Sequence, residues 1–216
     1  KATRLKQSQG KGIVAYNISD VRYRVTLTMP KIVDHDQYRK ELLMKCFDLF
    51  AEKGYASITM REIAKGLGVS TGTLYHYFPS KKDLFWQLIE EQTRQDNQAI
   101  MTEAGSAQTL EERIEAIFGF HAKHEDYFHK QILLGVDFYQ QQDREEVINN
   151  ETLKQMCEES RHFTAELLGL KDPALVNFGI CLLMGLLLLR LFEGEVVPFE
   201  EQAELLGKML TLYLEQ

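Results

Sequence analysis

Apolar residues recur every three or four positions along most of this chain from Gln37 onward, and glycines, prolines and capping residues interrupt the pattern at intervals. A period of about 3.6 residues is typical of helices that bury one face. Only four prolines punctuate the 216 residues. We therefore expect an all-α fold, with helices near residues 37–53, 59–68, 70–78, 80–103, 110–124, 127–141, 147–168, 173–192 and 199–214.

The segment 59–85 predicts two short helices joined by a tight turn. Thr59 can cap the first helix, and Glu62 stands three residues later, where a capping box requires it. Gly68 can end that helix and allow the turn. Ser70 then starts a second helix, which closes before the next proline. This order of signals indicates a helix-turn-helix.

The second helix of this pair has one apolar face and one polar face. Leu74 and Phe78 provide its apolar contacts. A short helix with a polar face after a glycine turn can dock into a partner, and the DNA major groove has the right width. The polar face, which makes the chain a candidate DNA reader, consists of Thr71, Thr73, Tyr75, His76 and Tyr77.

Residues 37–88 resemble the DNA-binding domain of the TetR family of bacterial transcriptional regulators. The resemblance rests on GVSTGTLYHYFPSKKDLF, on TMREIAKGLG before it and on the earlier helix ELLMKCFDLFAEKGY. It implies an N-terminal three-helix DNA-binding domain and a C-terminal helical domain for effector binding and dimerisation. We therefore expect an N-terminal extension over 1–34, the DNA-binding domain over 35–82 and the effector and dimer domain over 83–216.

Some residues of this motif can contact base edges and others phosphates. The resemblance implies that Arg61 reads a base, and its guanidinium can bond both O6 and N7 of guanine; a solvated surface arginine is the alternative. It also implies phosphate contacts for Tyr75, Tyr77 and Lys81, although either tyrosine could instead make a structural hydrogen bond. The full predicted DNA-binding set is Thr59, Arg61, Ser70, Thr71, Gly72, Thr73, Tyr75, His76, Tyr77 and Lys81.

The charge distribution favours this location for a DNA interface. The net charge of the chain is −7, which alone argues against a nucleic-acid partner. Residues 1–90, however, hold 15 Lys+Arg and 9 Asp+Glu, and residues 91–216 hold 10 and 23. A basic N-terminal part beside an acidic C-terminal part attracts phosphate on the helix-turn-helix side.

Residues 1–28 differ from the rest of the chain. They carry six Lys+Arg against one Asp, and Val21, Tyr23, Val25 and Leu27 alternate with polar residues. The segment can be an artificial leader or an early start ahead of Met29. It can also be a basic arm that follows DNA, or a strand that pairs with a neighbouring chain.

Neither a membrane nor an oxidising compartment is indicated. The longest apolar run, 178–189, has twelve residues and ends at an arginine, which is too short to span a bilayer. No signal peptide is visible at the start. Cys46, Cys157 and Cys181 lie far apart in apolar helical contexts, which suits reduced core thiols. We expect a cytoplasmic protein.

The last two predicted helices favour a homodimer. The run 178–189 is apolar nearly all round, which is more than one small domain needs to bury. The final helix adds Leu205, Leu206, Met209, Leu210 and Tyr213 at helical spacing. The family resemblance implies a four-helix interface at this place, and the alternative is a core helix of a monomer. A dimer predicts a palindromic operator.

An effector pocket is harder to locate, since its candidates are individually more typical of ordinary core. His121, His124, Glu125 and His129 fall within nine residues, but Glu-rich surroundings and the lack of a nearby cysteine argue against zinc. We expect no metal and no cofactor. The candidates for an apolar pocket with a few polar groups are Trp86, Phe118, His121, Phe128, Phe138, Tyr139, Met156, Phe163 and Met184.

The sequence therefore predicts a ligand-responsive transcriptional regulator, and specifically a repressor. A homodimer would bind a palindromic DNA operator and would be released by an apolar or amphipathic small-molecule effector. The alternative is an architectural or occlusion-type DNA-binding protein that uses the same fold without an effector. A helical enzyme is a third class, but no nucleophile–base pair or phosphate loop supports it.

Overall fold

The computed structural model describes residues 34–215, and over this range the chain is helical with no β-strand. The expected all-α fold is confirmed. The elements are α1 (His35–Lys53), α2 (Met60–Leu67), α3 (Thr71–Tyr77), α4 (Lys81–Glu103), the 3₁₀ turn η1 (Ala104–Ser106), α5 (Leu110–Lys123), α6 (Glu125–Gln140), α7 (Arg144–Ile148), α8 (Glu151–Leu168), α9 (Pro173–Glu193) and α10 (Phe199–Leu214).

The chain divides into two compact units, Lys1–Tyr38 and Arg39–Gln216. In the first unit only residues 34–38 are described. There Asp34 Oδ1 accepts hydrogen bonds at 3.1 Å from the backbone N–H groups of Asp36 and Gln37 and so caps α1. The alternatives for residues 1–28 lie outside the described residues. Within the second unit, the expected domain boundary between residues 82 and 83 stays a prediction.

Local capping determines where the first helices of the second unit begin. Thr59 and Glu62 form the complete capping box of α2, with each side chain bonded to the backbone of the other residue. Ser70 caps α3 by accepting from Thr73 N at 2.9 Å, and Ser80 caps α4 through Asp83 N at 3.0 Å. These starts agree with the signals in the sequence because each cap involves residues only three positions apart.

One predicted helix is wrong: residues 147–168 are two helices rather than one. Asp143 starts α7 by accepting from the backbone of Glu145, and Asn150 starts α8 by accepting from Leu153 N at 2.9 Å. An asparagine side chain that bonds the backbone two or three residues ahead competes with a continuous helix. The break therefore follows from a cap that the apolar periodicity did not reveal.

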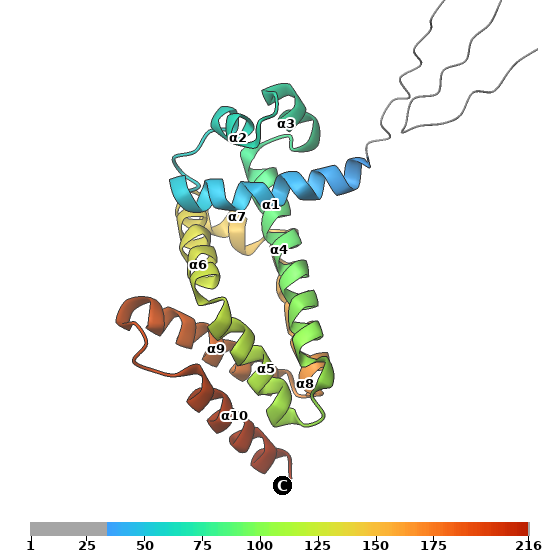
Figure 1. The fold of residues 1–216 in the computed structure, drawn as a ribbon, viewed down its shortest axis with the longest axis vertical. Helices are drawn as coiled ribbons and strands as arrows, with labels where there is room; N and C mark the ends of the chain where they lie inside the picture. Colours follow the sequence, from blue (N-terminus) through green and yellow to red (C-terminus); the bar gives the residue numbers. More distant parts are fainter. Residues whose placement is uncertain (1–33, 216) are drawn as a thin grey trace, which may run out of the picture. The chain divides into compact units, whose positions relative to one another are not determined.

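The C-terminal helices share one hydrophobic core. In Figure 1, α5 lies between α4 and α10, and α10 packs on α5 along most of its length. At Gly207 of α10 a Cβ atom would come within 3.1 Å of Glu111 Cγ and 3.5 Å of its Cα, so the glycine permits this close approach. Buried residues at the centre include Ile100, Ile114, Phe118, Leu168, Leu187 and Leu206.

The helix α9 is long and apolar enough to cross a membrane by length and composition alone, with a mean hydropathy of 2.2 over its most apolar window. The expectation from the sequence rested only on the uninterrupted apolar run of twelve residues, 178–189, which is too short to span a bilayer, whereas the whole helix has 21 residues. Only 28% of that window is buried within this chain. The side chains that α9 leaves exposed include Phe178, Leu188, Leu189 and Phe192.

The three cysteines do not share one environment. Cys46 is fully buried, and burial raises the pKa of its thiol to about 12. Cys157 is half-buried and Cys181 is exposed. The expectation of core thiols is therefore wrong for Cys181, because its side of α9 is not covered by the chain itself.

Candidate nucleic-acid interface and ligand cavity

A left-handed glycine sets the turn between α2 and α3. Gly68 has φ 69° and ψ 26°, and its N–H points to the carbonyls of Ala64 and Lys65. A side chain is disfavoured in this conformation, so glycine suits the position. The turn brings Leu74 of α3 and Ile63 of α2 into the core, where neither side chain is exposed to solvent.

The opposite side of this pair of helices faces outward. Arg61, Lys65, Ser70 and Thr71 line one open hollow at the α2–α3 turn. Within residues 34–215 the Arg61 side chain has no bonded partner. The predicted DNA-binding residues that are exposed are Thr59, Arg61, Ser70, Gly72, Tyr75 and His76, whereas Thr71, Thr73, Tyr77 and Lys81 are half-buried.

The hydroxyl groups of this surface also serve the local structure. Thr59 Oγ1 donates to Glu62 Oε2 at 2.7 Å, and Ser70 Oγ lies 2.8 Å from Thr73 Oγ1. His76 and Tyr77 meet edge to face, with ring centroids 5.1 Å apart. The same side chains that can face DNA therefore also stabilise the N-terminal ends of α2 and α3.

Lys81 has a structural role that the sequence did not indicate. Its Nζ donates to the carbonyl oxygens of Tyr55 at 2.7 Å, Ile58 at 2.9 Å and Ala56 at 3.4 Å. The ammonium also lies 4.5 Å from the centroid of the Tyr55 ring. Burial lowers the pKa of Lys81 from its ordinary value. We call this arrangement the Lys81 clasp; it holds the loop that joins α1 to α2 against the start of α4.

Five aromatic residues, which we call the aromatic junction, pack around the same loop: Phe50, Tyr55, Phe85, Trp86 and Phe138. Phe85 of α4 stacks on Phe138 of α6 at 4.4 Å between ring centroids, and Tyr55 meets both rings edge to face at 5.0 and 4.8 Å. Such pairs contribute about 0.5–1.5 kcal/mol each beyond burial. The C-terminal half of α6 is therefore packed directly against α4 and the loop that joins α1 to α2.

Polar contacts extend the aromatic junction. Asp137 Oδ2 on α6 accepts a hydrogen bond from Ala56 N at 3.1 Å, next to the Lys81 clasp. Lys82 at the start of α4 pairs with Glu146 of α7. A movement of α6 or α7 would thus act on the loop and on the beginning of α4, which together support α2 and α3.

A cavity of about 140 Å³ lies in the C-terminal core, among helices α4, α5, α8, α9 and α10. Most of its wall is apolar. Its polar lining groups are Asn97, His121, Ser160 and Thr164. The apolar lining consists of Ile100, Ile114, Ile117, Phe118, Phe163, Leu168, Gly179, Ile180, Leu183, Met184 and Leu206.

Residues 42–88 match the family model described as bacterial regulatory proteins of the tetR family. This match covers α2, α3 and the helices on either side of them, which are the elements that carry the exposed surface. These residues form a DNA-binding domain of the TetR-family type. The resemblance read from the motif is confirmed.

Curated relatives match over 24% to 39% of the chain. The transcriptional activator FasR of Mycolicibacterium smegmatis is 34% identical over 91 residues, which are 39% of this chain and 41% of FasR. The repressor KstR2 of Mycobacterium tuberculosis is 43% identical over 51 residues, 24% of this chain and 26% of KstR2. The nucleoid occlusion factor SlmA of Actinobacillus pleuropneumoniae is 41% identical over 70 residues, which are 32% of this chain and 35% of SlmA. The matched segments thus span less than half of these relatives.

Solved structures extend the likeness of fold to the C-terminal helices. The transcriptional regulator FadR of Bacillus subtilis, in complex with stearoyl-CoA, has a TM-score of 0.63 at 16% identity and covers 80% of this chain and 97% of its own. FadR of Bacillus halodurans has a TM-score of 0.63 at 19% identity and covers 84% of this chain and 96% of its own. At these identities the comparison shows a shared fold and nothing about the ligand of this chain.

Four of the nine side chains predicted for the TetR-family pocket line the cavity: Phe118, His121, Phe163 and Met184. The structure places the other five elsewhere. Trp86 and Phe138 belong to the aromatic junction, and Tyr139, with 46% of its surface exposed, faces outward. Phe128 stacks on the far side of the His121 ring, and Met156 is buried outside the cavity lining. Helical periodicity could not separate these environments because all of them are apolar.

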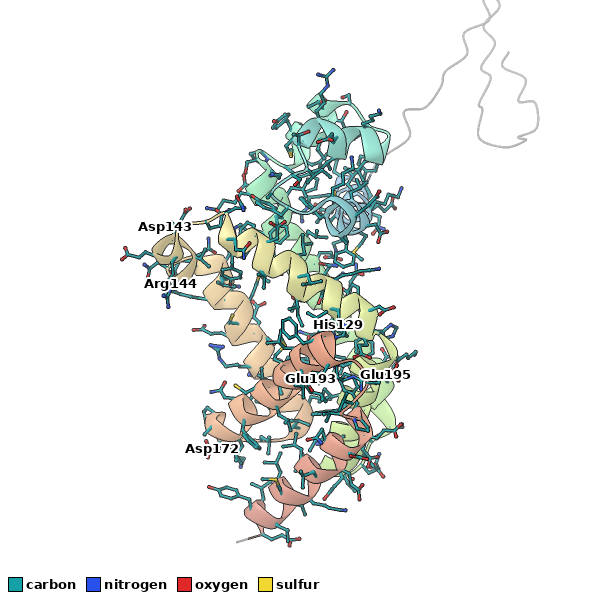
Figure 2. The ribbon with its side chains drawn as sticks, turned by 90° about the vertical axis from the view of Figure 1, so that its left-hand side faces the viewer. His129, Asp143, Arg144, Asp172, Glu193 and Glu195 are labelled. Atoms are coloured by element: carbon teal, nitrogen blue, oxygen red, sulfur yellow. The ribbon has the colours of Figure 1, made fainter. Side chains whose placement is uncertain are left out.

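The histidine-rich segment 121–129 serves packing and an ion pair. Arg190 of α9 donates from Nε and Nη2 to the two Glu125 oxygens at 2.6 and 2.8 Å, and from Nη1 to Val197 O at 2.8 Å. His129 Nε2 lies 2.9 Å from Leu187 O, and Figure 2 shows His129 near the C-terminal end of α9. Among the described residues no group of three His, Cys, Asp or Glu could hold a metal ion.

Proposed function

We propose that this protein is a homodimeric TetR-type repressor that binds a palindromic operator in the cytoplasm. The observation that carries the proposal is the exposed face of α2 and α3, which lies inside the segment matched to the family. Arg61 offers a free guanidinium on this face, next to Ser70 and Thr71.

In this proposal the contacts divide into two kinds. Arg61, Thr71 and Thr73 read base edges, because guanidinium and hydroxyl groups can discriminate them. Thr59, Tyr75, Tyr77 and Lys81 hold phosphates, with Ser70, Gly72 and His76 close to the groove. For Lys81 a direct phosphate contact competes with the three carbonyls of the Lys81 clasp, so its contribution to DNA binding includes support of the loop.

Dimerisation is supported by the apolar surface that α9 and α10 leave uncovered. On α9, Phe192 exposes 78% of its surface and Phe178 46%; on α10, Leu212 exposes 63% and Met209 49%. Two long neighbouring helices with exposed apolar side chains fit a four-helix interface between copies. A second copy would also cover α9, whose composition alone would permit a membrane span.

We place the effector in the cavity between α4 and the C-terminal helices. Binding there would displace α4 or α5, and α5 continues into α6, which ends at the aromatic junction. The Lys81 clasp and the Asp137–Ala56 hydrogen bond would carry the change to α2 and α3. Release from DNA requires that the effector bind the non-operator conformation more tightly than the operator conformation.

One observation favours a second candidate, a nucleoid-occlusion or architectural protein. A segment of 70 residues is 41% identical to SlmA, a nucleoid occlusion factor. The match covers only 32% of this chain, so it leaves the role of most of the chain open.

Mapping of bound sites across the genome of the source organism distinguishes the two. A regulator occupies a few promoters, and added effector reduces that occupancy. Hundreds of dispersed sites that do not respond to small molecules would favour occlusion. An Arg61→Ala variant should lose the promoter sites, and their retention would contradict the proposed interface.

A further inference from the structure

The cavity in the C-terminal core has no charged wall. None of its lining residues is Asp, Glu, Lys or Arg. Burial of a carboxylate or an ammonium without a partner is costly, whereas a neutral hydroxyl needs only one or two hydrogen bonds. The cavity therefore discriminates against charged ligands.

Three of its four polar groups lie toward one end. Residues 104–109 connect α4 to α5, so these helices are antiparallel, and Arg113 Nη1 of α5 lies 3.5 Å from Leu167 O near the end of α8. The end of α4, the start of α5 and the end of α8 thus meet at the apolar end of the cavity. From those helix ends Asn97, Ser160 and His121 lie about two to three helical turns away and Thr164 about one, so three of the four polar side chains lie toward the opposite end.

His121 presents a hydrogen-bond acceptor at this polar end. Its Nδ1 lies 2.7 Å from Ile117 O, and because a carbonyl only accepts, Nδ1 carries the proton. Burial lowers the pKa of His121, so the ring is neutral near pH 7 and Nε2 carries a lone pair. The ring stacks on Phe128 at 4.2 Å, which fixes its orientation. Among the described residues Nε2 has no hydrogen-bond partner.

The size of the cavity limits the ligand. Its volume of about 140 Å³ is similar to that of an engineered apolar cavity of about 150 Å³ that takes up benzene. A ligand of roughly six to ten non-hydrogen atoms therefore fits without large rearrangement. A long acyl chain would exceed this volume in the conformation described.

We infer that the effector of this protein is a small uncharged alcohol or phenol whose hydroxyl donates to His121 Nε2. Its apolar body lies among Ile100, Ile114 and Leu168, and Asn97 or Ser160 contacts the same hydroxyl. The inference rests on the proposed function for the consequence of binding. Ligand binding itself does not depend on the proposed function.

Isothermal titration calorimetry with four eight-carbon probes tests the head group. The probes are 1-octanol, methyl heptyl ether, octanoate and octylamine, each titrated into the full chain at pH 7.5. We expect 1-octanol to bind best, the ether to bind roughly five- to tenfold more weakly because it cannot donate, and both ions to bind at least tenfold more weakly. No binding of 1-octanol, or equal binding of octanoate or octylamine, would overturn the inference.

The anchor is tested by His121→Phe, which keeps the ring and removes the acceptor. The variant should lose the preference for 1-octanol over the ether. The control is His162→Phe, an exposed histidine outside the cavity, which should retain the preference. If His121→Phe retains it too, His121 is not the anchor. If His121→Phe does not fold, the head-group series on the unchanged protein still decides the ligand class.

The same protein samples are also tested for sequence-specific DNA binding in the absence of ligand. Absence of specific DNA binding would defeat the proposed function and leave the head-group ranking intact. Specific DNA binding together with equal uptake of ions would defeat the ligand inference alone. If the proposed function and the ligand inference are both correct, 1-octanol should release that DNA and octanoate should not.

Discussion

The helix-turn-helix and the C-terminal core of this protein differ in how their structure is specified. In residues 59–85 each helix begins at a cap that bonds a residue three positions ahead, and the turn depends on one left-handed glycine. In α5–α10 the decisive contacts join residues far apart, such as Glu125 and Arg190. The first region is specified locally and the second by packing.

Similarity to known proteins is also of two kinds. Identities of 34–43% are found over segments of 51 to 91 residues, whereas the similarity over 80–84% of the chain is one of fold, at 16–19% identity. A DNA-reading surface needs particular side chains at fixed spacing. A core that encloses a ligand needs only apolar side chains of suitable total volume, so many sequences satisfy it.

The largest expected effect on stability lies in the C-terminal region, at Arg190. Arg190→Met should lower the free energy of unfolding by about 3 kcal/mol, because Glu125, whose side chain is 20% exposed, would lose the guanidinium and keep only His129 at 3.7 Å. Urea denaturation measures the loss. The exposed Arg161→Met is the control and should change stability by less than about 0.5 kcal/mol.

The dependence of stability on pH gives a second test of the Glu125–Arg190 pair. Arg190 holds the pKa of Glu125 below its ordinary value. The stabilisation is therefore complete above the unfolded-state pKa and is lost as the pH falls through the lower folded-state value. Arg190→Met should lack this part of the decline in stability between about pH 5 and pH 3. An unchanged acid profile would contradict the pair as a stabilising contact.

The Lys81 clasp tests whether the two regions are coupled. Lys81→Met should lower the free energy of unfolding by about 1–3 kcal/mol, since three carbonyls lose their donor. The neighbouring Lys82→Met, which removes a more exposed ion pair, should have a much smaller effect. A phosphate contact without the clasp would give the opposite pattern: unchanged stability, and a salt dependence of DNA binding reduced by about one ion.

These contacts also mark the limit of prediction from the sequence. The helix-turn-helix, its caps and its glycine turn could be read because their signals lie within a few residues. The Lys81 clasp, the aromatic junction and the Glu125–Arg190 pair could not, since most of their partners are separated by 23 to 83 residues. The break between α7 and α8 had a local signal, Asn150, which the apolar pattern obscured.

Arg61 separates function from stability within the local region. Arg61→Ala should weaken operator binding by about 1–3 kcal/mol per half-site and relax the preference at one base position. Stability should not change, because the guanidinium has no partner in the described chain. The measurement is fluorescence anisotropy with operator and single-base variants. Arg144→Ala on α7 is the control, and equal losses in both variants would contradict base reading by Arg61.

The smallest expected effects come from two matched threonines. Thr59 and Thr109 both cap helices through the same capping box, one in each region. Thr59→Ala and Thr109→Ala should each cost about 1 kcal/mol of stability. Only Thr59→Ala should also weaken DNA binding, by about 0.5–1 kcal/mol, if its hydroxyl meets a phosphate. Equal DNA affinities for the two variants would remove Thr59 from the interface.

Selection of bound DNA from a random pool, using the purified full chain, tests the central claim most directly. We predict enrichment of one palindromic consensus whose half-sites are spaced by about one turn of DNA or somewhat more, as expected for two α3 helices in a symmetric dimer. The consensus would establish the reader, the dimer and the half-site spacing together. Enrichment of no sequence above background would contradict the assignment of α2 and α3 as a DNA-reading surface.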